Sequence, residues 1–151
     1  MSSFRNEVVI ERPAEDVFAY LADFENIPRW NYAISRTVKL TPGPVRIGTE
    51  YEQMRAIPRP GTERFTVVAM AAPARLEIDG QLGPFDARLA YKVQAVGPSR
   101  TLLVNEASVA LPGALSMLSP LLAHRVGSAV AANLDVLRAL LETPQPAQPI
   151  A

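Results

Sequence analysis

The chain has 151 residues, and its 15 basic and 15 acidic side chains give a formal net charge of zero. It contains no cysteine, which excludes disulfides, thiol nucleophiles and thiolate metal sites. No run of like charges favours phosphate backbones, so we do not expect a nucleic-acid partner. Neither a secretory signal nor a stretch of roughly 18 apolar residues occurs, so we expect a cytoplasmic protein without stable membrane insertion.

The N-terminal region predicts one strand followed by two short helices. Residues 4–11 alternate in polarity and place Val8 and Ile10 on one side. Pro13 suits the first position of a helix, and the two acidic residues that soon follow it favour a helix N-terminus. Asp23 is a good cap for the second short helix.

From Tyr32 to about Val109 the polarity alternates with a period of two, which predicts six further strands. Short turns rich in proline and glycine separate them, so consecutive strands should pair antiparallel. The predicted strands span residues 32–40, 46–57, 63–71, 74–81, 85–96 and 100–110.

The stretch from Pro112 to Glu142 predicts a long amphipathic helix around which the rest of the chain is organised. Its apolar residues recur at steps of three and four and form one stripe. The stripe consists of Leu115, Leu118, Leu122, Val126, Val130, Leu134, Leu137 and Leu141. Pro120 lacks an N–H, so we expect a kink or a new helix start there, with Ser119 as the cap. The proline-rich tail, residues 143–151, is expected to be disordered.

These elements predict an α+β fold. One helix cannot cover both sides of a seven-stranded sheet, so the economical arrangement is a curved antiparallel sheet that grips the long helix on its concave face. The two short helices lie between the first and second strands. We expect residues 1–142 to form this single helix-grip domain, with a cavity between the sheet and the helix.

Several short motifs follow one another along the chain. They are the helix start at Pro13, the run from Asp23 to Trp30, Val45-x-x-Gly48, Ser99-Arg100-Thr101, and Leu111-Pro112-Gly113 before the leucine-rich helix. In this order they resemble the START-like, birch-allergen-like superfamily, in its polyketide cyclase/dehydrase and lipid-transport (SRPBCC) branch. Arg12 stands where this family usually has a serine or threonine cap, a departure that affects the helix start only. The resemblance implies a helix-grip fold with a pocket for a hydrophobic or aromatic small molecule, but it does not settle the chemistry.

Strand alternation and the helix stripe together predict the lining of that pocket. Asn133 interrupts the stripe, and it either bonds to a neighbouring backbone group or faces the cavity. Arg55 and Tyr51 could instead lie at the rim and reach water. The predicted ligand-binding residues are Tyr51, Gln53, Arg55, Leu89, Tyr91, Asn105, Val126, Val130 and Asn133.

The sequence assigns no catalytic residue, no metal site and no cofactor. His124, the only histidine, lies opposite the apolar stripe and should face solvent. A cyclase or dehydratase needs a proton acceptor beside a hydrogen-bond donor. Arg55 or a tyrosine could donate, but no inward carboxylate is evident as the base. Trp30, Phe24 and Phe18 are expected in the core, or alternatively at the pocket mouth.

Three functions stay open on this reading. The first is a binding or carrier protein, monomeric or homodimeric, that encloses a small hydrophobic or aromatic ligand. The second is a cyclase/dehydratase-type enzyme that acts on an aromatic or polyketide-like intermediate without a metal or nucleotide cofactor. The third is a structural or partner-binding domain with a closed core. The shortage of an inward acid–base pair favours the first.

Overall fold

A computed structural model of the chain describes residues 2–111, 113 and 119–143. The strands are β1 (Ser2–Ile10), β2 (Ile34–Lys39), β3 (Glu50–Arg55), β4 (Gly61–Ala71), β5 (Arg75–Leu82), β6 (Phe85–Gly97) and β7 (Arg100–Val109). The helices are α1 (Ala14–Ala22), the 3-10 turn η1 (Phe24–Asn26), α2 (Ile27–Trp30) and α4 (Ser119–Glu142). The predicted disordered tail beyond residue 143 and the first turns of the predicted long helix lie outside the described residues.

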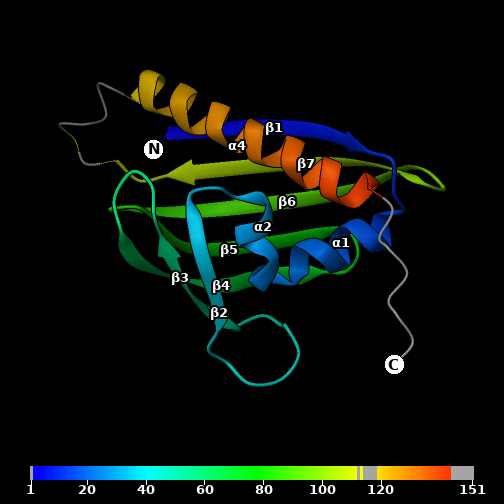
Figure 1. Cartoon of the computed structure of the whole chain (residues 1–151), viewed down its shortest axis with the longest axis horizontal. Helices are drawn as coiled ribbons and strands as arrows, with labels where there is room; N and C mark the ends of the chain where they lie inside the picture. Colours follow the sequence, from blue (N-terminus) through cyan, green and yellow to red (C-terminus); the bar gives the residue numbers. More distant parts are fainter. Residues whose placement is uncertain (1, 112, 114–118, 144–151) are drawn as a thin grey trace.

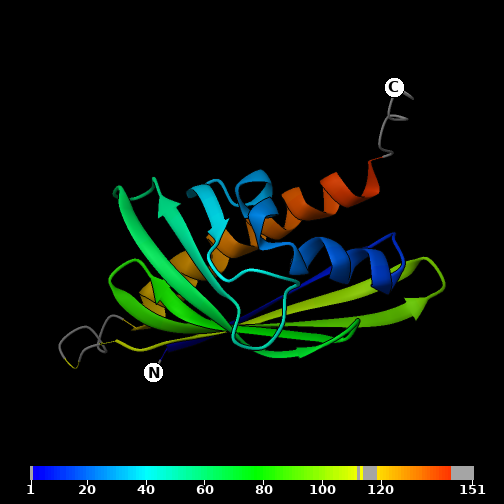
Figure 2. The same cartoon turned by 90° about the horizontal axis from the view of Figure 1, so that it is seen from below.

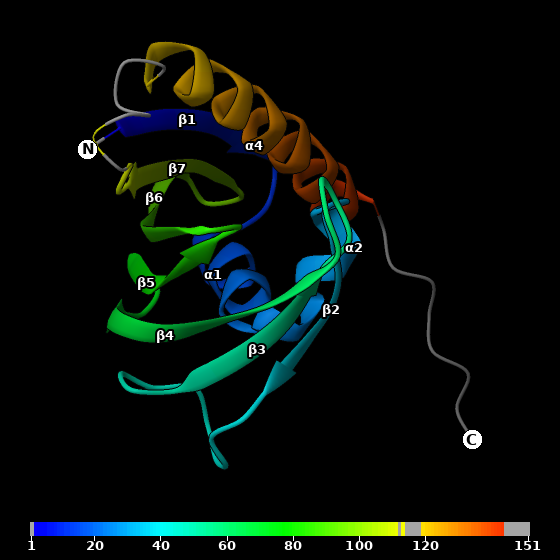
Figure 3. The same ribbon diagram turned by 90° about the vertical axis from the view of Figure 1, so that its left-hand side faces the viewer.

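All seven strands form one antiparallel sheet in the order β1-β7-β6-β5-β4-β3-β2. The sheet curls strongly, with α1 and α2 in its opening and α4 along its β1 side (Figure 3). Figures 1 and 2 show α4 crossing the concave side, next to β1. The predicted helix-grip fold is therefore confirmed, including the two short helices between the first two strands.

Side-chain hydrogen bonds join α4 to β1 and to the residue two positions beyond its end. The Nδ2 atom of Asn6 donates to the carbonyl of Gly127 at 3.1 Å. Near the other end, Arg12 Nη1 donates to the carbonyl of Leu141 at 2.7 Å, and thus satisfies one of the last helix carbonyls. The contacts at Gly127 and Leu141 together hold α4 alongside β1.

Burial along the α4 stripe is uneven. Leu134, Leu137 and Leu141 are at most 6% exposed, whereas Val126 and Val130 are only half-buried. The C-terminal half of the helix therefore packs closely, while the preceding turns face a less completely filled interior.

Aromatic rings join the first short helices to the sheet. Phe24 makes edge contacts with Tyr51 and Phe65, at centroid distances of 5.1 and 5.3 Å, and those two rings stack at 5.0 Å. Such pairs add about 0.5–1.5 kcal/mol beyond area burial. Trp30 and Phe18 are also buried, so the core placement predicted for these aromatic residues is confirmed.

The predicted strand 46–57 is wrong at both ends, because β3 covers only Glu50–Arg55. Before it, the Thr49 N–H bonds to the Arg46 carbonyl at 3.0 Å, and Gly48 has φ +96°, which closes a turn instead of extending the strand. A period of two over residues 46–57 would put Ile47 and Ile57 on the same side as Tyr51, but they are 62% and 48% exposed.

Two helix starts also differ from expectation. Pro13 precedes the first residue of α1 and is not itself helical. Asp23 takes the cap position of η1, but its side chain makes no capping hydrogen bond. The structure describes α4 from Ser119 onward, and residues 114–118 lie outside the described part of the chain, so the helix start expected at Pro120 stays a prediction.

Candidate functional site

A small cavity of about 60 Å³ lies between α2 and the inner face of strands β3 to β6. Its lining mixes aromatic, aliphatic and polar side chains: Ile27, Trp30, Asn31, Gln53, Arg55, Phe65, Ile78, Gly80, Gln81, Leu89 and Tyr91. Four of the predicted ligand-binding residues thus share one cavity, namely Gln53, Arg55, Leu89 and Tyr91. Trp30 of α2, expected in the core or at the pocket mouth, is buried and also lines this cavity, whereas the contribution of β5 was not predicted.

A buried carboxylate, Glu63, lies next to these lining residues on the inner face of β4. It is 4% exposed and pairs in register with Gln53, whose Nε2 donates to Glu63 Oε1 at 2.9 Å. Arg55 donates from Nε at 2.6 Å and from Nη2 at 3.1 Å, and the Gly83 N–H adds a fourth bond at 2.8 Å. The expectation that no carboxylate points inward is therefore wrong.

The sequence contained a signal for this residue. Glu63 alternates with Phe65 and Val67, and that alternation places all three on the inner face of β4. From the sequence of β4 alone, a glutamate near the start of the strand is predicted to face solvent. Its burial becomes evident only when its cross-strand partners are considered.

The four hydrogen bonds define what Glu63 can do. A carboxylate offers about four acceptor directions, and donors already occupy that number here. Glu63 therefore orients Arg55 rather than accepting a substrate proton. Arg55 itself, with 11% of its side chain exposed, uses only part of its five N–H groups, since its Nη1 makes a long 3.4 Å contact with the Ile57 carbonyl. It can present a donor to a molecule in the cavity.

Two buried amides, on β7 and α4, carry acceptors that lack partners among the described residues. Asn105 is fully buried; its Nδ2 donates weakly to the Ala90 carbonyl at 3.5 Å, whereas its Oδ1 accepts no hydrogen bond from the described chain. Asn133 is 5% exposed, and its Oδ1 likewise accepts no hydrogen bond from the described chain. An unsatisfied buried acceptor costs about 1–3 kcal/mol, so both positions favour a bound water or ligand.

The tyrosines occupy different surroundings. Burial, followed by the charges of Asp23 and Glu25, raises the pKa of Tyr51 from 10.0 to about 12. Tyr51 belongs to the aromatic cluster with Phe24, not to the cavity lining. Burial also raises the pKa of Tyr91, which lines the cavity beside Arg55 as a neutral hydroxyl.

The predicted lining residues on α4, Val126 and Val130, do not line this cavity and are half-buried. His124 is exposed, as predicted. No helix among the described residues combines the length and apolarity that crossing a bilayer requires.

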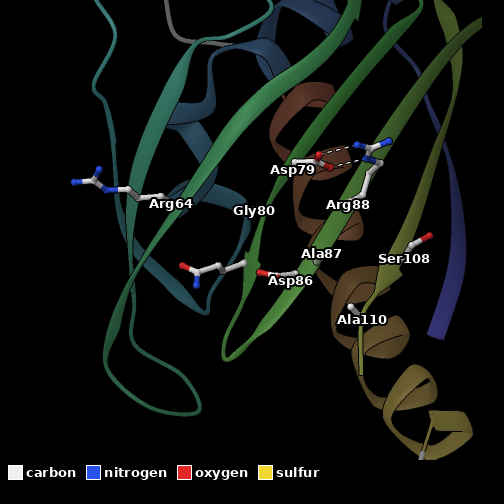
Figure 4. Close-up of a pocket in the computed structure, with 9 residues that line it drawn as sticks. Arg64, Asp79, Gly80, Asp86, Ala87, Arg88, Ser108 and Ala110 are labelled. Carbon is white, nitrogen blue, oxygen red and sulfur yellow. Dashed lines mark hydrogen bonds and ion pairs between the residues drawn. The ribbon is translucent and has the colours of Figure 1, made fainter. Parts of the chain in front are cut away.

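A larger hollow, of about 740 Å³, lies on the outer face of the sheet (Figure 4). Charged side chains surround it, including the Asp79–Arg88 pair, whose Oδ2 and Nη2 atoms are 2.6 Å apart. That hydrogen bond, more than the charge attraction, lowers the pKa of Asp79. With this open and charged lining, the hollow is poorly suited to an apolar ligand.

Comparison with known proteins agrees with this architecture. A START superfamily protein from Mycobacterium smegmatis has a TM-score of 0.77 at 20% identity, over 94% of this chain and 98% of that one. The protein TTHA0849 from Thermus thermophilus gives 0.75 at 15% identity, over 92% and 96%. The Zhui aromatase/cyclase from Streptomyces sp. R1128 gives 0.75 at 14% identity, over 93% of both chains. At these identities the likeness shows a common fold.

No curated protein matches the chain. The family model described as "Polyketide cyclase / dehydrase and lipid transport" matches residues 1–142, which is nearly all of the sequence. Together with the START-like fold, this match shows that the chain belongs to the polyketide cyclase/dehydrase and lipid transport family.

Proposed function

We propose that this protein binds a small hydrophobic or aromatic molecule between the sheet and α4, as a carrier or binding protein. The observation that carries this proposal is the pair of buried amide oxygens, on Asn105 and Asn133, that find no partner in the described part of the chain. A ligand hydroxyl or a water held beside the ligand would satisfy them.

The surrounding walls support an apolar guest. Leu89 on β6 and Val130 on α4 pack against the core but remain half-buried, as does Val126 on the same helix. Ligand sites are mostly apolar with a few placed polar groups, and this interior has that composition. Burying these side chains against a ligand would contribute about 25 cal/mol for each Å² of apolar surface.

The cavity beside α2, which neither α4 nor the two buried asparagines line, must enlarge towards α4 to take such a ligand. Its volume of about 60 Å³ is well below the roughly 300–1,000 Å³ of small-molecule sites. Ile27 and Trp30 close it from α2, which is only four residues long. We therefore expect ligand uptake to displace α2 from the sheet, while the Arg55–Glu63 pair keeps the opposite wall in place.

The alternative function is a cyclase/dehydratase-type enzyme acting on an aromatic or polyketide-like intermediate. The donor that Arg55 can present beside the Tyr91 hydroxyl favours it, because such a pair could stabilise an enolate oxygen. The same reaction needs a proton acceptor, and the acceptor sites of Glu63 are already occupied. The described residues thus favour binding over catalysis.

Two measurements test the proposal. Native mass spectrometry of the purified protein should reveal a co-isolated small molecule. The Asn133→Leu variant should fold normally but bind an environment-sensitive apolar dye with altered affinity. Ser128→Leu is the matched control, because it adds the same side chain at an exposed position of the same helix. Dye affinity that is equal in the two variants and the unchanged protein, with no co-isolated molecule, would refute a binding cavity.

A further inference from the structure

The zero net charge of the chain conceals an uneven distribution. Residues 32–59 contain five basic and two acidic side chains, whereas the rest of the chain contains ten basic and thirteen acidic ones. This segment comprises the edge strand β2, strand β3 and the loops that flank them. It therefore carries a local positive charge on a chain that is otherwise acidic.

Ion pairing sharpens this contrast. Elsewhere on the described chain, most basic side chains pair with an acidic neighbour, as Arg88 does with Asp79 and Lys92 with Glu106. Among the basic residues of segment 32–59, only Arg55 is paired. No ion pair of the described residues involves the other four, which are Arg36, Lys39, Arg46 and Arg59.

Large apolar side chains are exposed among these cations. Tyr32 is 60% exposed, Leu40 41%, Ile47 62% and Ile57 48%. We call these four residues, together with the four unpaired cations, the β2 face. It follows the β2 edge of the sheet, with Tyr32, Ile57 and Arg59 at one end of the β2–β3 pair and Lys39, Leu40, Arg46 and Ile47 at the other. Each end thus combines exposed apolar side chains with unpaired cations, a composition suited to an interaction surface.

The fold leaves this face accessible. β2 is the last strand of the sheet order, so its outer edge has no strand partner in the described structure. The loop between β2 and β3 projects from the sheet (Figure 3). The face also adjoins the interior, because Trp30 and Asn31, just before Tyr32, line the cavity together with Arg55.

We propose that the β2 face docks on the surface of an anionic lipid bilayer. Each basic residue near such a surface contributes about 1 kcal/mol, or about 5-fold in partitioning. The exposed aliphatic side chains enter the interfacial region, where they gain by leaving water. This inference goes beyond ligand binding and does not require it, although docking here would place the cavity beside a source of apolar ligand.

Other partners fit the face less well. Nucleic acid would attract the cations but would offer nothing to Ile47 and Ile57, and a stacking platform needs aromatic rings, of which the face has only Tyr32. A second copy pairing edge to edge along β2 would bring like charges together, which is unfavourable.

Sedimentation with vesicles tests the proposal. The full chain should bind vesicles of two parts phosphatidylcholine to one part phosphatidylglycerol, should not bind phosphatidylcholine alone, and should be released by salt. The Arg46→Gln/Arg59→Gln variant should lower the partition coefficient by about 30-fold. The control variant Arg75→Gln/Lys92→Gln changes the charge equally but outside the β2 face, and it should bind nearly as well as the unchanged protein.

A second variant separates insertion from charge attraction. Ile47→Ser/Ile57→Ser should weaken binding to the anionic vesicles and leave the salt dependence unchanged. Failure of the unchanged protein to bind anionic vesicles would overturn the proposal. So would equal losses in the two charge variants, tighter binding to a single-stranded oligonucleotide than to vesicles at the same salt, or a dimer that the Arg46→Gln/Arg59→Gln variant dissociates.

Discussion

Removal of the Glu63 carboxylate tests most directly whether the Arg55–Glu63 pair is a buried part of the cavity wall. In Glu63→Ala, the guanidinium of Arg55 loses both of its short ion-pair contacts, and the N–H groups of Gln53 and Gly83 lose an acceptor. Breaking a buried pair by deleting one partner costs about 3–5 kcal/mol, because the remaining charge has no compensation.

The structure places the expected cost at the lower end of that range. Arg55 keeps 11% of its side chain exposed, so the unpaired cation can recover some hydration. We therefore expect the free energy of unfolding to fall by about 3 kcal/mol, with a melting temperature roughly 6–12 °C lower for a domain of this size.

Urea unfolding of a double-mutant cycle checks this reasoning. The double variant Arg55→Met/Glu63→Leu replaces both charges with apolar side chains, and it should be considerably more stable than Glu63→Ala. A loss below about 1 kcal/mol in Glu63→Ala would show a solvated surface pair, and the closed cavity wall would then be wrong. In the cycle of Arg55→Met, Glu63→Leu and their double variant, additive effects of the two single changes would refute the coupling.

Two further predictions concern residues near the cavity. Gly80→Ala should destabilise the fold by about 1–3 kcal/mol in thermal unfolding, because an added Cβ would lie 2.5 Å from the Phe65 Cβ and 2.7 Å from the Arg64 carbonyl; Gly61→Ala, where a Cβ meets nothing within 4 Å, is the control. The raised pKa of Tyr51 stabilises the fold below pH 10.0, and that contribution is lost as the pH rises towards about 12. Tyr51→Phe should therefore flatten the loss of stability with pH in that window, and an unchanged pH profile would contradict it.

The fold followed from periodicity because burial alternates wherever a strand lies between the core and solvent. The inner row of β7, from Leu103 to Val109, is buried as its alternation predicts. The predicted boundaries of β3 were wrong for a local reason. The apolar residues Ile47 and Ile57 continue the alternation of polarity beyond the two points where the chain leaves the sheet. Hydrophobicity alone cannot distinguish a strand residue from an exposed apolar loop residue.

The site was less predictable than the fold because its chemistry depends on cross-strand pairs. Gln53, Arg55 and Tyr91 were identified from alternation within single strands. Glu63 was missed because its role appears only when β3 and β4 are placed in register. The walls supplied by α2 depend on a tertiary contact between Trp30 and the sheet, which no periodicity in the sequence encodes.

The distribution of polar groups also separates a fixed side of the interior from a movable one. The Arg55–Glu63 network ties β3, β4 and the turn after β5 together through charge-assisted hydrogen bonds, so that side resists displacement. On the α4 side, Asn133 has an oxygen without a partner among the described residues and Val130 is only half-buried, so the helix packs less tightly there than around Leu137 and Leu141. A ligand that enlarges the interior should therefore displace α2 and α4 before it disturbs the strands. Hydrogen exchange upon ligand binding should accordingly change most in these helices.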